Sequence, residues 1–459
     1  MICAAINHPH PAAAIAGARW VVVGLGQTGL SCVRFLAAQG AEVSVVDTRE
    51  NPPQLSALRR EHPTLAVHCG ELPLERLLRV ANWVISPGVA LDHPAVRAAK
   101  LAGIAVMGDL ELFAQHATAP YIGITGSNGK STVTTLVAEI LAASGATVKA
   151  GANLGPPALD LLAPPAPAYY VLELSSFQLE AAHSLAPTVA AILNISADHL
   201  DRHHSIDAYA AAKARILCHA QQAVLNADDP RVAALGRECP DVRWISLQQP
   251  GDGRYSVLES AGERWLVVGS TRILPSAALQ IKGTHNEFNA LAALAITDLI
   301  GVSRAAQCAV LQRFVGLEHR CRLVAESAGV SWFNDSKGTN VGAASASISG
   351  IFATRSGVLI AGGQGKGADF RELRPALAGR VHAVILIGED ARQIAAAIDD
   401  IVEVHHARDM RSAVEHAARL SQPGEAVLLS PACASFDMFK NYIARGHAFE
   451  AAVREWVRT

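Results

Sequence analysis

Long apolar runs are missing from this sequence of 459 residues, although half of its residues are hydrophobic. A membrane-spanning helix needs about 20 consecutive, mostly apolar residues, and no stretch of the sequence approaches that length. Residues 1–17 also lack a basic segment ahead of their short apolar stretch, which His and Pro interrupt, so we predict no signal peptide. These absences predict a cytoplasmic protein that does not insert into a membrane.

The chain also lacks an excess of one charge and any pairing of its cysteines. Its 39 Lys and Arg oppose 41 Asp and Glu, and the formal net charge of -2 offers no general attraction to nucleic acid. Its eight cysteines stand singly, with no C-x-x-C pair and no metal-type spacing. We therefore expect reduced thiols that are mostly buried. The partners expected are small molecules, and the expected state is a monomer.

Length and hydrophobic pattern together predict three domains. At about 100 to 200 residues per domain, the chain is too long for one core. Short β-branched runs alternate with helical stretches, a pattern typical of α/β domains with parallel sheets. The predicted fold class is α/β, with Rossmann-like domains at 1–108 and 318–459 and a central domain of the P-loop ATPase type at 109–317.

The alternation locates individual elements along the chain. Helices are expected at 30–38 and at 131–144, and the Pro- and Ala-rich segment 156–167 is expected only to connect. The predicted strands are 20–23, 43–46, 83–85, 121–125, 169–174, 190–195, 357–361, 383–387 and 426–430.

The strongest local motif is T-G-S-N-G-K-S-T at 125–132, between a predicted strand and a predicted helix. Its glycines let backbone N–H groups surround phosphates, Lys130 can reach the β- and γ-phosphates, and Ser131 can hold Mg²⁺. The strict G-x-x-x-x-G-K-[ST] pattern is not met, because Ile124 stands where the first glycine belongs. A glycine turn that merely caps a helix is the weaker alternative. The motif predicts nucleotide triphosphate binding by Gly126, Ser127, Asn128, Gly129, Lys130, Ser131 and Thr132.

Two further groups of polar residues follow predicted strands of the same domain. Glu173 ends a buried strand, where a carboxylate can face a phosphate-bound cation, although a salt-bridged structural Glu is an alternative. The run N-I-S-A-D-H-L-D at 194–201 supplies potential ligands for a hard cation. Such a run is by itself more often a solvated loop. The neighbouring phosphate-binding motif is what raises its value.

Near the N-terminus, G-L-G-Q-T-G at 24–29 is a complete G-x-G-x-x-G, and Asp47 ends the next predicted strand. This pattern is typical of a diphosphate at a helix N-terminus with the acid on a ribose hydroxyl. Taken alone it indicates NAD and a dehydrogenase. A structural turn without ligand is the other alternative. The phosphate-binding motif in the middle of the same chain argues instead for ATP.

In combination and in this order, the motifs resemble the Mur ligase family, whose members form amide bonds with ATP in peptidoglycan precursor synthesis. The resemblance is strongest to the member that adds D-glutamate to UDP-N-acetylmuramoyl-L-alanine, and the D-N-P-R-type signature of the diaminopimelate- or lysine-adding relatives is not evident. It covers almost the whole chain and is carried by residues 24–31, 47–49, 86–88, 125–132, 173–180, 198–202, 283–289, 316–320, 334–340, 362–370 and 430–435.

The resemblance implies that ATP phosphorylates the alanyl carboxylate and that the amine of glutamate attacks the acyl phosphate. It assigns catalytic roles to Lys130, His199 and Lys213. It assigns the UDP substrate to Gln27, Thr28, Gly29, Asp47, Thr48, Gly88 and Asn153. It adds Asn286, Asn289, Arg320 and Asp335 to the ATP site. It implies two Mg²⁺ ions held by Ser131, Glu173, His199 and a carbamylated Lys213.

Nothing in the residues themselves singles out Lys213, since a lone Lys on an Ala-rich helix is usually a solvated surface charge. For glutamate the resemblance implies Lys337, Thr339, Lys366, Ser435 and Tyr442. Loops at the carboxyl ends of parallel strands converge on one crevice, and lysines and hydroxyls suit a dicarboxylate. Gln364 and Tyr442 depart from the family, which usually has Asp and Phe there.

Three hypotheses stay open at this stage. A dehydrogenase would use a nicotinamide on the first domain. A P-loop switch or regulatory NTPase would hydrolyse ATP without needing a carboxylate and an amine. A sister ligase, acting with another amino acid or on folate, would share nearly all the motifs.

Overall fold

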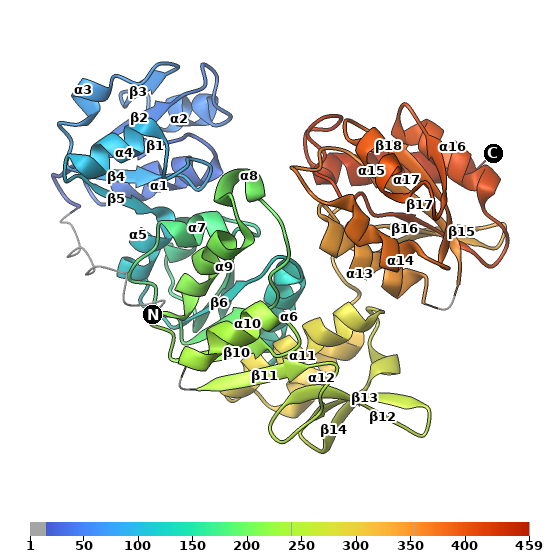
Figure 1. The fold of residues 1–459 in the computed structure, drawn as a ribbon. Coiled ribbons are helices and arrows are strands. Elements are labelled where there is room, and N and C mark those ends of the chain that lie inside the picture. The colour runs from blue at the N-terminus through green and yellow to red at the C-terminus, as the bar shows by residue number, and fades with distance from the viewer. Residues whose placement is uncertain (1–14, 240, 354, 459) are drawn as a thin grey trace.

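The computed structural model describes residues 15–458 apart from 240 and 354, and it forms three α/β units in chain order (Figure 1). We predicted no signal peptide in residues 1–17. Residues 1–14 of that segment lie outside the described range. Within the described part of the chain, no helix has the length and apolar character needed to cross a membrane.

The first unit is a parallel sheet in the order β3-β2-β1-β4-β5. Its strands are β1 (Arg19–Val23), β2 (Glu42–Asp47), β3 (Ala66–Cys69), β4 (Asn82–Ile85) and β5 (Ala105–Gly108). Its helices are α1 (Gln27–Ala38), α2 (Leu55–Glu61), α3 (Leu74–Leu77) and α4 (Pro94–Leu101). The chain order reverses between β1 and β4, so a crevice opens at the carboxyl ends of these two strands.

The middle unit has a nine-stranded sheet in the order β14-β13-β12-β11-β10-β9-β6-β8-β7. Its strands are β6 (Tyr121–Thr125), β7 (Val148–Ala152), β8 (Tyr169–Glu173), β9 (Val189–Ile192), β10 (Gln222–Asn226), β11 (Val242–Ser246), β12 (Tyr255–Ser260), β13 (Glu263–Val268) and β14 (Thr271–Pro275). Its helices are α5 (Asp109–His116), α6 (Lys130–Ala143), α7 (Ser176–Glu180), α8 (Leu200–His203), α9 (Ile206–Ala214), α10 (Pro230–Leu235), α11 (Thr284–Leu299) and α12 (Arg304–Arg313). The pairs β12–β13 and β13–β14 are antiparallel, and the other pairs are parallel.

The third unit has a six-stranded sheet in the order β15-β16-β20-β17-β18-β19, in which only the β15–β16 pair is antiparallel. Its strands are β15 (Arg322–Ser327), β16 (Val330–Asn334), β17 (Gly357–Gly362), β18 (Val381–Ile387), β19 (Glu403–His406) and β20 (Ala426–Leu429). Its helices are α13 (Val341–Ile351), α14 (Arg374–Leu377), α15 (Ala391–Ile398), α16 (Met410–Leu420) and α17 (Tyr442–Arg458). The predicted three-domain α/β fold is therefore confirmed, while the limits proposed for the domains stay a prediction.

Some local expectations were wrong. The strand expected over 190–195 ends at Ile192, because Asn194 leaves the sheet and bonds the phosphate-binding loop. The segment 156–167 does more than connect: it contains a 3₁₀ helix, η1 (Ala158–Leu162), whose Asp160 accepts a 2.6 Å hydrogen bond from Ser31 of the first domain. The cysteines that the structure describes are not mostly buried; Cys32 and Cys433 are buried, and Cys69, Cys218, Cys239, Cys308 and Cys321 are partly exposed.

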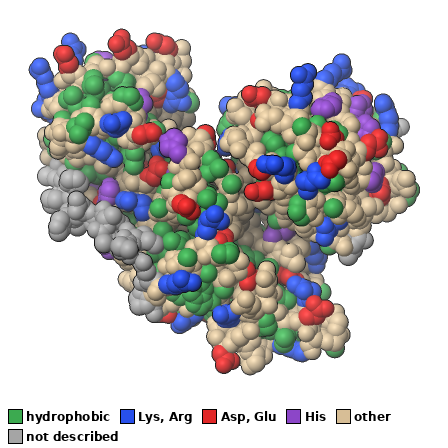
Figure 2. Space-filling model, viewed as in Figure 1, with side chains coloured by type: hydrophobic (Ala, Val, Ile, Leu, Met, Phe, Trp, Pro, Cys, Tyr) green, Lys and Arg blue, Asp and Glu red, His purple; other side chains and the backbone are tan. Residues whose placement is uncertain are grey.

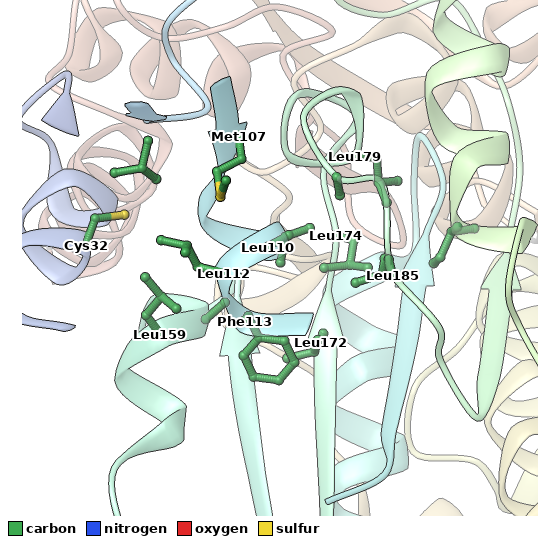
Figure 3. Close-up of a cluster of buried hydrophobic side chains, with 14 of the residues drawn as sticks. Cys32, Met107, Leu110, Leu112, Phe113, Leu159, Leu172, Leu174, Leu179 and Leu185 are labelled. Atoms are coloured by element: carbon green, nitrogen blue, oxygen red, sulfur yellow. The ribbon is translucent and has the colours of Figure 1, made fainter. Parts of the chain in front are cut away.

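One continuous apolar core joins the first and middle domains. Cys32 and Met107 from the first domain share it with Leu110, Phe113 and Leu172 of the middle domain (Figure 3). Full burial of one Leu or Phe contributes about 1.5–3 kcal/mol, so this core holds the two domains together as one body. The third domain has separate apolar clusters of its own, and its hydrogen bonds to the middle domain are made by polar side chains.

Candidate active site

A cavity of about 740 Å³ lies between the middle and third domains. The space-filling view is hollowed where these domains meet (Figure 2). Cavities that hold small ligands commonly measure about 300–1,000 Å³, so this one has room for a nucleotide and a second molecule. Its walls carry the phosphate-binding loop on one side and the carboxyl-end loops of the third domain's sheet on the other.

The phosphate-binding loop spans the turn from β6 to α6. Gly126 and Gly129 have φ values of +150° and +83°, which side chains with a Cβ rarely adopt. A Cβ on Gly129 would also lie 2.6 Å from Oδ1 of Asn289. Lys130 folds back over the loop and donates from Nζ to the carbonyl oxygens of Gly126 and Ser127, at 2.7 and 2.8 Å. No side chain caps α6, so its first N–H groups are available to phosphate oxygens.

Glu173 lies at the end of β8 and is 3% exposed. Its Oε1 accepts a 2.6 Å hydrogen bond from Asn153, while its Oε2 is buried without a hydrogen-bond partner among the described residues. Burial alone would raise the pKa of Glu173, but the charge of Lys130, the hydroxyl of Ser131 and the hydrogen bond from Asn153 hold the pKa below its ordinary value. An ionised, unpartnered carboxylate oxygen beside a phosphate site suits a divalent cation.

His199 directly precedes α8, as its N-cap residue, in a left-handed backbone conformation with φ of +53°. Its ring packs edge-on against Phe177, with 4.8 Å between the centroids. Burial, joined by the charges of Lys366 and Lys130, lowers the pKa of His199 to about 4 despite the neighbouring Asp198. The imidazole is therefore neutral at physiological pH, as a metal ligand must be.

Lys213 lies on α9 and is 1% exposed, so the expectation from its sequence surroundings alone, a surface charge, is wrong. Its Nζ donates to the carbonyl of Gly126 at 2.9 Å and to Oγ1 of Thr125 at 3.4 Å, and lies 4.5 Å from the ring centroid of Tyr209. Burial and the charge of Lys130 lower its pKa well below the ordinary value for lysine. The amine therefore lies directly under the phosphate-binding loop, where its protonated form is less favoured than in an exposed lysine.

The five residues proposed for glutamate come together on the third-domain wall of the cavity: Lys337, Thr339, Lys366, Ser435 and Tyr442. Nζ of Lys337 lies 4.1 Å from the ring centroid of Tyr442. Ser435 is buried, and Gln364 forms a backbone bridge with Ala434 that does not use its side chain.

The residues added to the ATP site also line the cavity, but their contacts differ. Arg320 reaches across from the third domain and donates to Oγ of Ser131 at 2.7 Å. Asp335, in contrast, already accepts hydrogen bonds from Ser347 and Ser430, at 2.6 and 2.7 Å. Asn286 and Asn289 face the loop from the start of α11, and a 3.0 Å hydrogen bond joins their side chains.

The residues proposed for the UDP substrate do not form one group. Asn153 lines the cavity, whereas Gln27, Thr28, Gly29, Asp47, Thr48 and Gly88 belong to the first domain and do not. Asp47 accepts hydrogen bonds from the backbone N–H of Leu25 at 2.7 Å and from the guanidinium of Arg49 at 2.6 Å. Its carboxylate therefore orients the glycine turn. A Cβ on Gly29 would lie 1.9 Å from the carbonyl oxygen of Gly24, which explains the third glycine of the motif.

Reasoning from the sequence missed two side chains that complete the site. Tyr209 lies beside the phosphate-binding loop, with its hydroxyl 3.2 Å from Oγ of Ser127. Asn340 caps α13 of the third domain and also hydrogen-bonds Asn128 and Asp198, at 3.3 and 3.0 Å. Asn340 lies in the segment 334–340 that carries the family resemblance, but Asn is also a common N-cap, and a cap does not indicate a contact between domains.

Fold and site together define a nucleotide-dependent enzyme, in which a phosphate-binding loop faces a cation-lined wall on another domain. Comparison with known proteins gives the family. Residues 18–108 match the N-terminal domain of MurD-like Mur ligases, residues 124–297 the Mur ligase middle domain, and residues 319–433 the glutamate ligase domain of Mur ligases. The chain belongs to the Mur ligase family.

Relatives named UDP-N-acetylmuramoylalanine--D-glutamate ligase match nearly the whole chain. Those of Nitrosococcus oceani and Pseudomonas fluorescens are each 49% identical, over 95% of this chain and 96% and 97% of their own lengths. Among solved structures, UDP-N-acetylmuramate-alanine ligase MurC from Thermotoga maritima matches with a TM-score of 0.61 at 18% identity, over 95% of this chain and 99% of its own. A pseudomurein peptide ligase type C from Methanothermus fervidus matches with the same score and identity, over 96% and 100%.

Proposed function

We propose that this chain joins D-glutamate to UDP-N-acetylmuramoyl-L-alanine at the expense of ATP, giving ADP and phosphate. The observation that carries the proposal is the shared cavity, in which a phosphate-binding loop and a lysine- and hydroxyl-lined wall face each other across a domain boundary. The relatives at 49% identity support the choice of substrates. ADP release should require both the muramoyl-alanine and the amino acid, and ADP release without either would favour a plain NTPase.

The chemistry follows from the parts of the cavity. The alanyl carboxylate oxygen attacks the γ-phosphorus of ATP and ADP departs; the glutamate amine then attacks the carbonyl carbon and phosphate departs. Lys130 and Arg320 can neutralise negative charge on the transferring phosphoryl group, and preorganised charges of this kind supply much of an enzyme's rate enhancement. Closure of the third domain brings the amine to the acyl phosphate and excludes water.

Divalent cations fit the residues present, because the free Oε2 of Glu173 and the neutral imidazole of His199 both line the cavity. Ser131 and a carbamylated Lys213 would complete the set for two Mg²⁺ ions, which when bound would neutralise charge on the phosphates. The burial of Lys213 and its neutral hydrogen-bond acceptors, Gly126 and Thr125, support the carbamate. Carbamylation would turn a destabilised cation into an anionic ligand.

The uridine substrate is assigned to the crevice of the first domain, where α1 begins at Gln27 without a side-chain cap. Thr28 and Gly29 lie in its first turn, where a diphosphate is stabilised by the helix dipole and free N–H groups. We also propose a cytoplasmic monomer, as expected from the sequence.

Lys366→Ala and Ser435→Ala should each raise the KM for D-glutamate about tenfold, because each removes a charged or hydroxyl contact made to one substrate. The KM values for ATP and for the UDP substrate should stay within about twofold. Steady-state kinetics with each substrate varied in turn measure all three. Weakened ATP binding with unchanged glutamate binding would assign this wall to the wrong ligand.

Glutamate binding should also weaken at alkaline pH. Burial and the charge of Arg320 lower the pKa of Lys337 to about 8, so its ammonium is present below that pH and is lost above it. The KM for D-glutamate should therefore rise between about pH 8 and pH 10. In Lys337→Arg the guanidinium stays charged over this range, and the rise should disappear. An identical rise in the variant would exclude Lys337 as its source.

A further inference from the structure

Arg202 connects the first-domain loop that is proposed to bind the UDP substrate with the region of the middle domain around His199, which is proposed to bind a cation. It lies on the four-residue helix α8, three residues after His199, and its side chain is only 14% exposed. Its guanidinium donates to the carbonyl oxygens of Pro87 and Val89, at 3.4 and 3.1 Å. These two residues flank Gly88, in the first-domain loop assigned to the UDP substrate.

The same guanidinium is held firmly on the side of the middle domain. It donates to Oε2 of Glu180 at 2.9 Å, while Oε1 of Glu180 lies 3.0 Å from Nδ1 of His203. The other ring nitrogen of His203 lies 3.0 Å from Oγ of Ser176. Burial alone would raise the pKa of Glu180, but His203 and Arg202 hold the pKa below its ordinary value. The carboxylate is therefore charged, and the pair with Arg202 is an ionic one.

Arg202 also reaches His199 through an aromatic ring. Its guanidinium carbon lies 4.7 Å from the ring centroid of Phe177, within range of a cation–π contact. The ring of His199 packs edge-on against the same Phe177, at 4.8 Å, and the ring of His203 stacks on it at 5.6 Å. Phe177 therefore lies between the ring of His199 and the guanidinium of Arg202, whose other contacts are with Glu180 and with the first domain.

We infer that Arg202 is a positioning residue, which holds the first-domain loop around Gly88 in register with the imidazole of His199. The inference rests on the proposed function, because it names the binding of the UDP substrate and of a divalent cation as the two events that Arg202 connects. Ser86 extends the connection on the first-domain side, since its Oγ donates to the carbonyl oxygen of Gly24 at 2.8 Å. The loop around Gly88 is thus hydrogen-bonded both to Arg202 and to the glycine turn at Gly24.

The test is Arg202→Ala, with two binding measurements that do not need turnover. Calorimetry with UDP-N-acetylmuramoyl-L-alanine, without ATP, should show affinity about tenfold weaker than in the unmutated chain, as expected when charge-assisted hydrogen bonds are lost. Mn²⁺ binding, followed by electron paramagnetic resonance as a probe for Mg²⁺, should weaken in the same variant. The KM for D-glutamate should stay within about twofold.

Three further variants separate positioning from general stability. Arg202→Lys keeps the cation near Phe177 and Glu180 but cannot fork to the carbonyls, so it should restore part of both affinities. Glu180→Gln should shift both affinities in the same direction by less. Arg215→Ala is the matched control: its guanidinium bonds the carbonyls of Leu179 and Ala182 at 2.9 and 2.8 Å, at the end of the same helix α7. It should lower the melting temperature without changing either affinity.

Unchanged affinities in Arg202→Ala would overturn the inference. An equal loss of affinity for all substrates, together with a lowered melting temperature, would also overturn it, because that result is expected when a residue only stabilises the fold. If the unmutated chain does not bind UDP-N-acetylmuramoyl-L-alanine at all, the proposed function fails and the inference fails with it. If the unmutated chain binds and ligates its substrates but Arg202→Ala leaves both affinities unchanged, the inference fails while the proposed function stands.

Discussion

Lys130→Ala is expected to lower turnover by at least about 100-fold, because removing one preorganised charge contact from a transition state commonly costs that much. Binding of UDP-N-acetylmuramoyl-L-alanine should be nearly unchanged, since the residues assigned to its diphosphate belong to another domain. Single-turnover formation of ADP measures the chemical step, and calorimetry measures binding of the UDP substrate.

Lys149→Ala provides a matched control for this variant. Lys149 also lies in the middle domain, donates to the backbone carbonyls of Leu161 and Ala163, and does not line the cavity. Its loss should change turnover by no more than about twofold. Near-normal turnover in Lys130→Ala would contradict the assignment of residues 125–132 to the triphosphate.

Lys213→Ala is expected to lower the activity at least about tenfold, the scale of loss seen when residues that hold a metal site are removed. In the unmutated chain, activity should depend on dissolved CO₂, because a carbamate forms only from a neutral amine. Burial and Lys130 lower the pKa of Lys213, so the neutral amine is more abundant at neutral pH than in an exposed lysine and declines as the pH falls. Enzyme stripped of CO₂ at lower pH should lose activity and regain it with bicarbonate.

Two observations would count against the carbamate. One is activity that ignores CO₂ under both conditions, and the other is an intact mass without an added CO₂ in freshly prepared enzyme. Lys213→Ala serves as the control, because its residual activity should not respond to bicarbonate.

The strands predicted from the sequence are parallel strands whose apolar runs end in a turn, such as β1, β6 and β17. Other parallel strands were missed: β3, β5, β7, β10, β11 and β19. The strands β12, β13 and β14, which form the antiparallel edge of the middle domain's sheet, also escaped prediction. Polar and charged residues such as Glu259, Glu263 and Arg264 interrupt their apolar pattern at this exposed edge. The segment 156–167 was misjudged for a related reason: composition shows Pro and Ala, but only the fold shows Leu159 and Leu161 buried beside the first domain.

Some residues of the candidate site could be predicted from the sequence, and others could not. The phosphate-binding loop is contiguous, so its residues can be recognised along the chain without knowledge of the fold. Lys213 becomes noticeable only when α9 places it under Gly126, 87 positions earlier in the chain. Asn340 and Asn128, separated by 212 positions, meet only when the third domain packs on the middle one. Contacts of such separation depend on topology, which local patterns do not encode.

We propose that this chain forms one particular amide bond at the cavity between its middle and third domains. The most direct test is ligated product, identified by mass spectrometry, over a matrix of UDP-muramoyl acceptors and amino acids supplied with ATP and Mg²⁺. We predict that UDP-N-acetylmuramoyl-L-alanine with D-glutamate gives ligated product and ADP in equal amounts, far faster than L-glutamate or any other pair. Efficient ligation of a different pair, or ADP formed without any ligated product, would contradict the account.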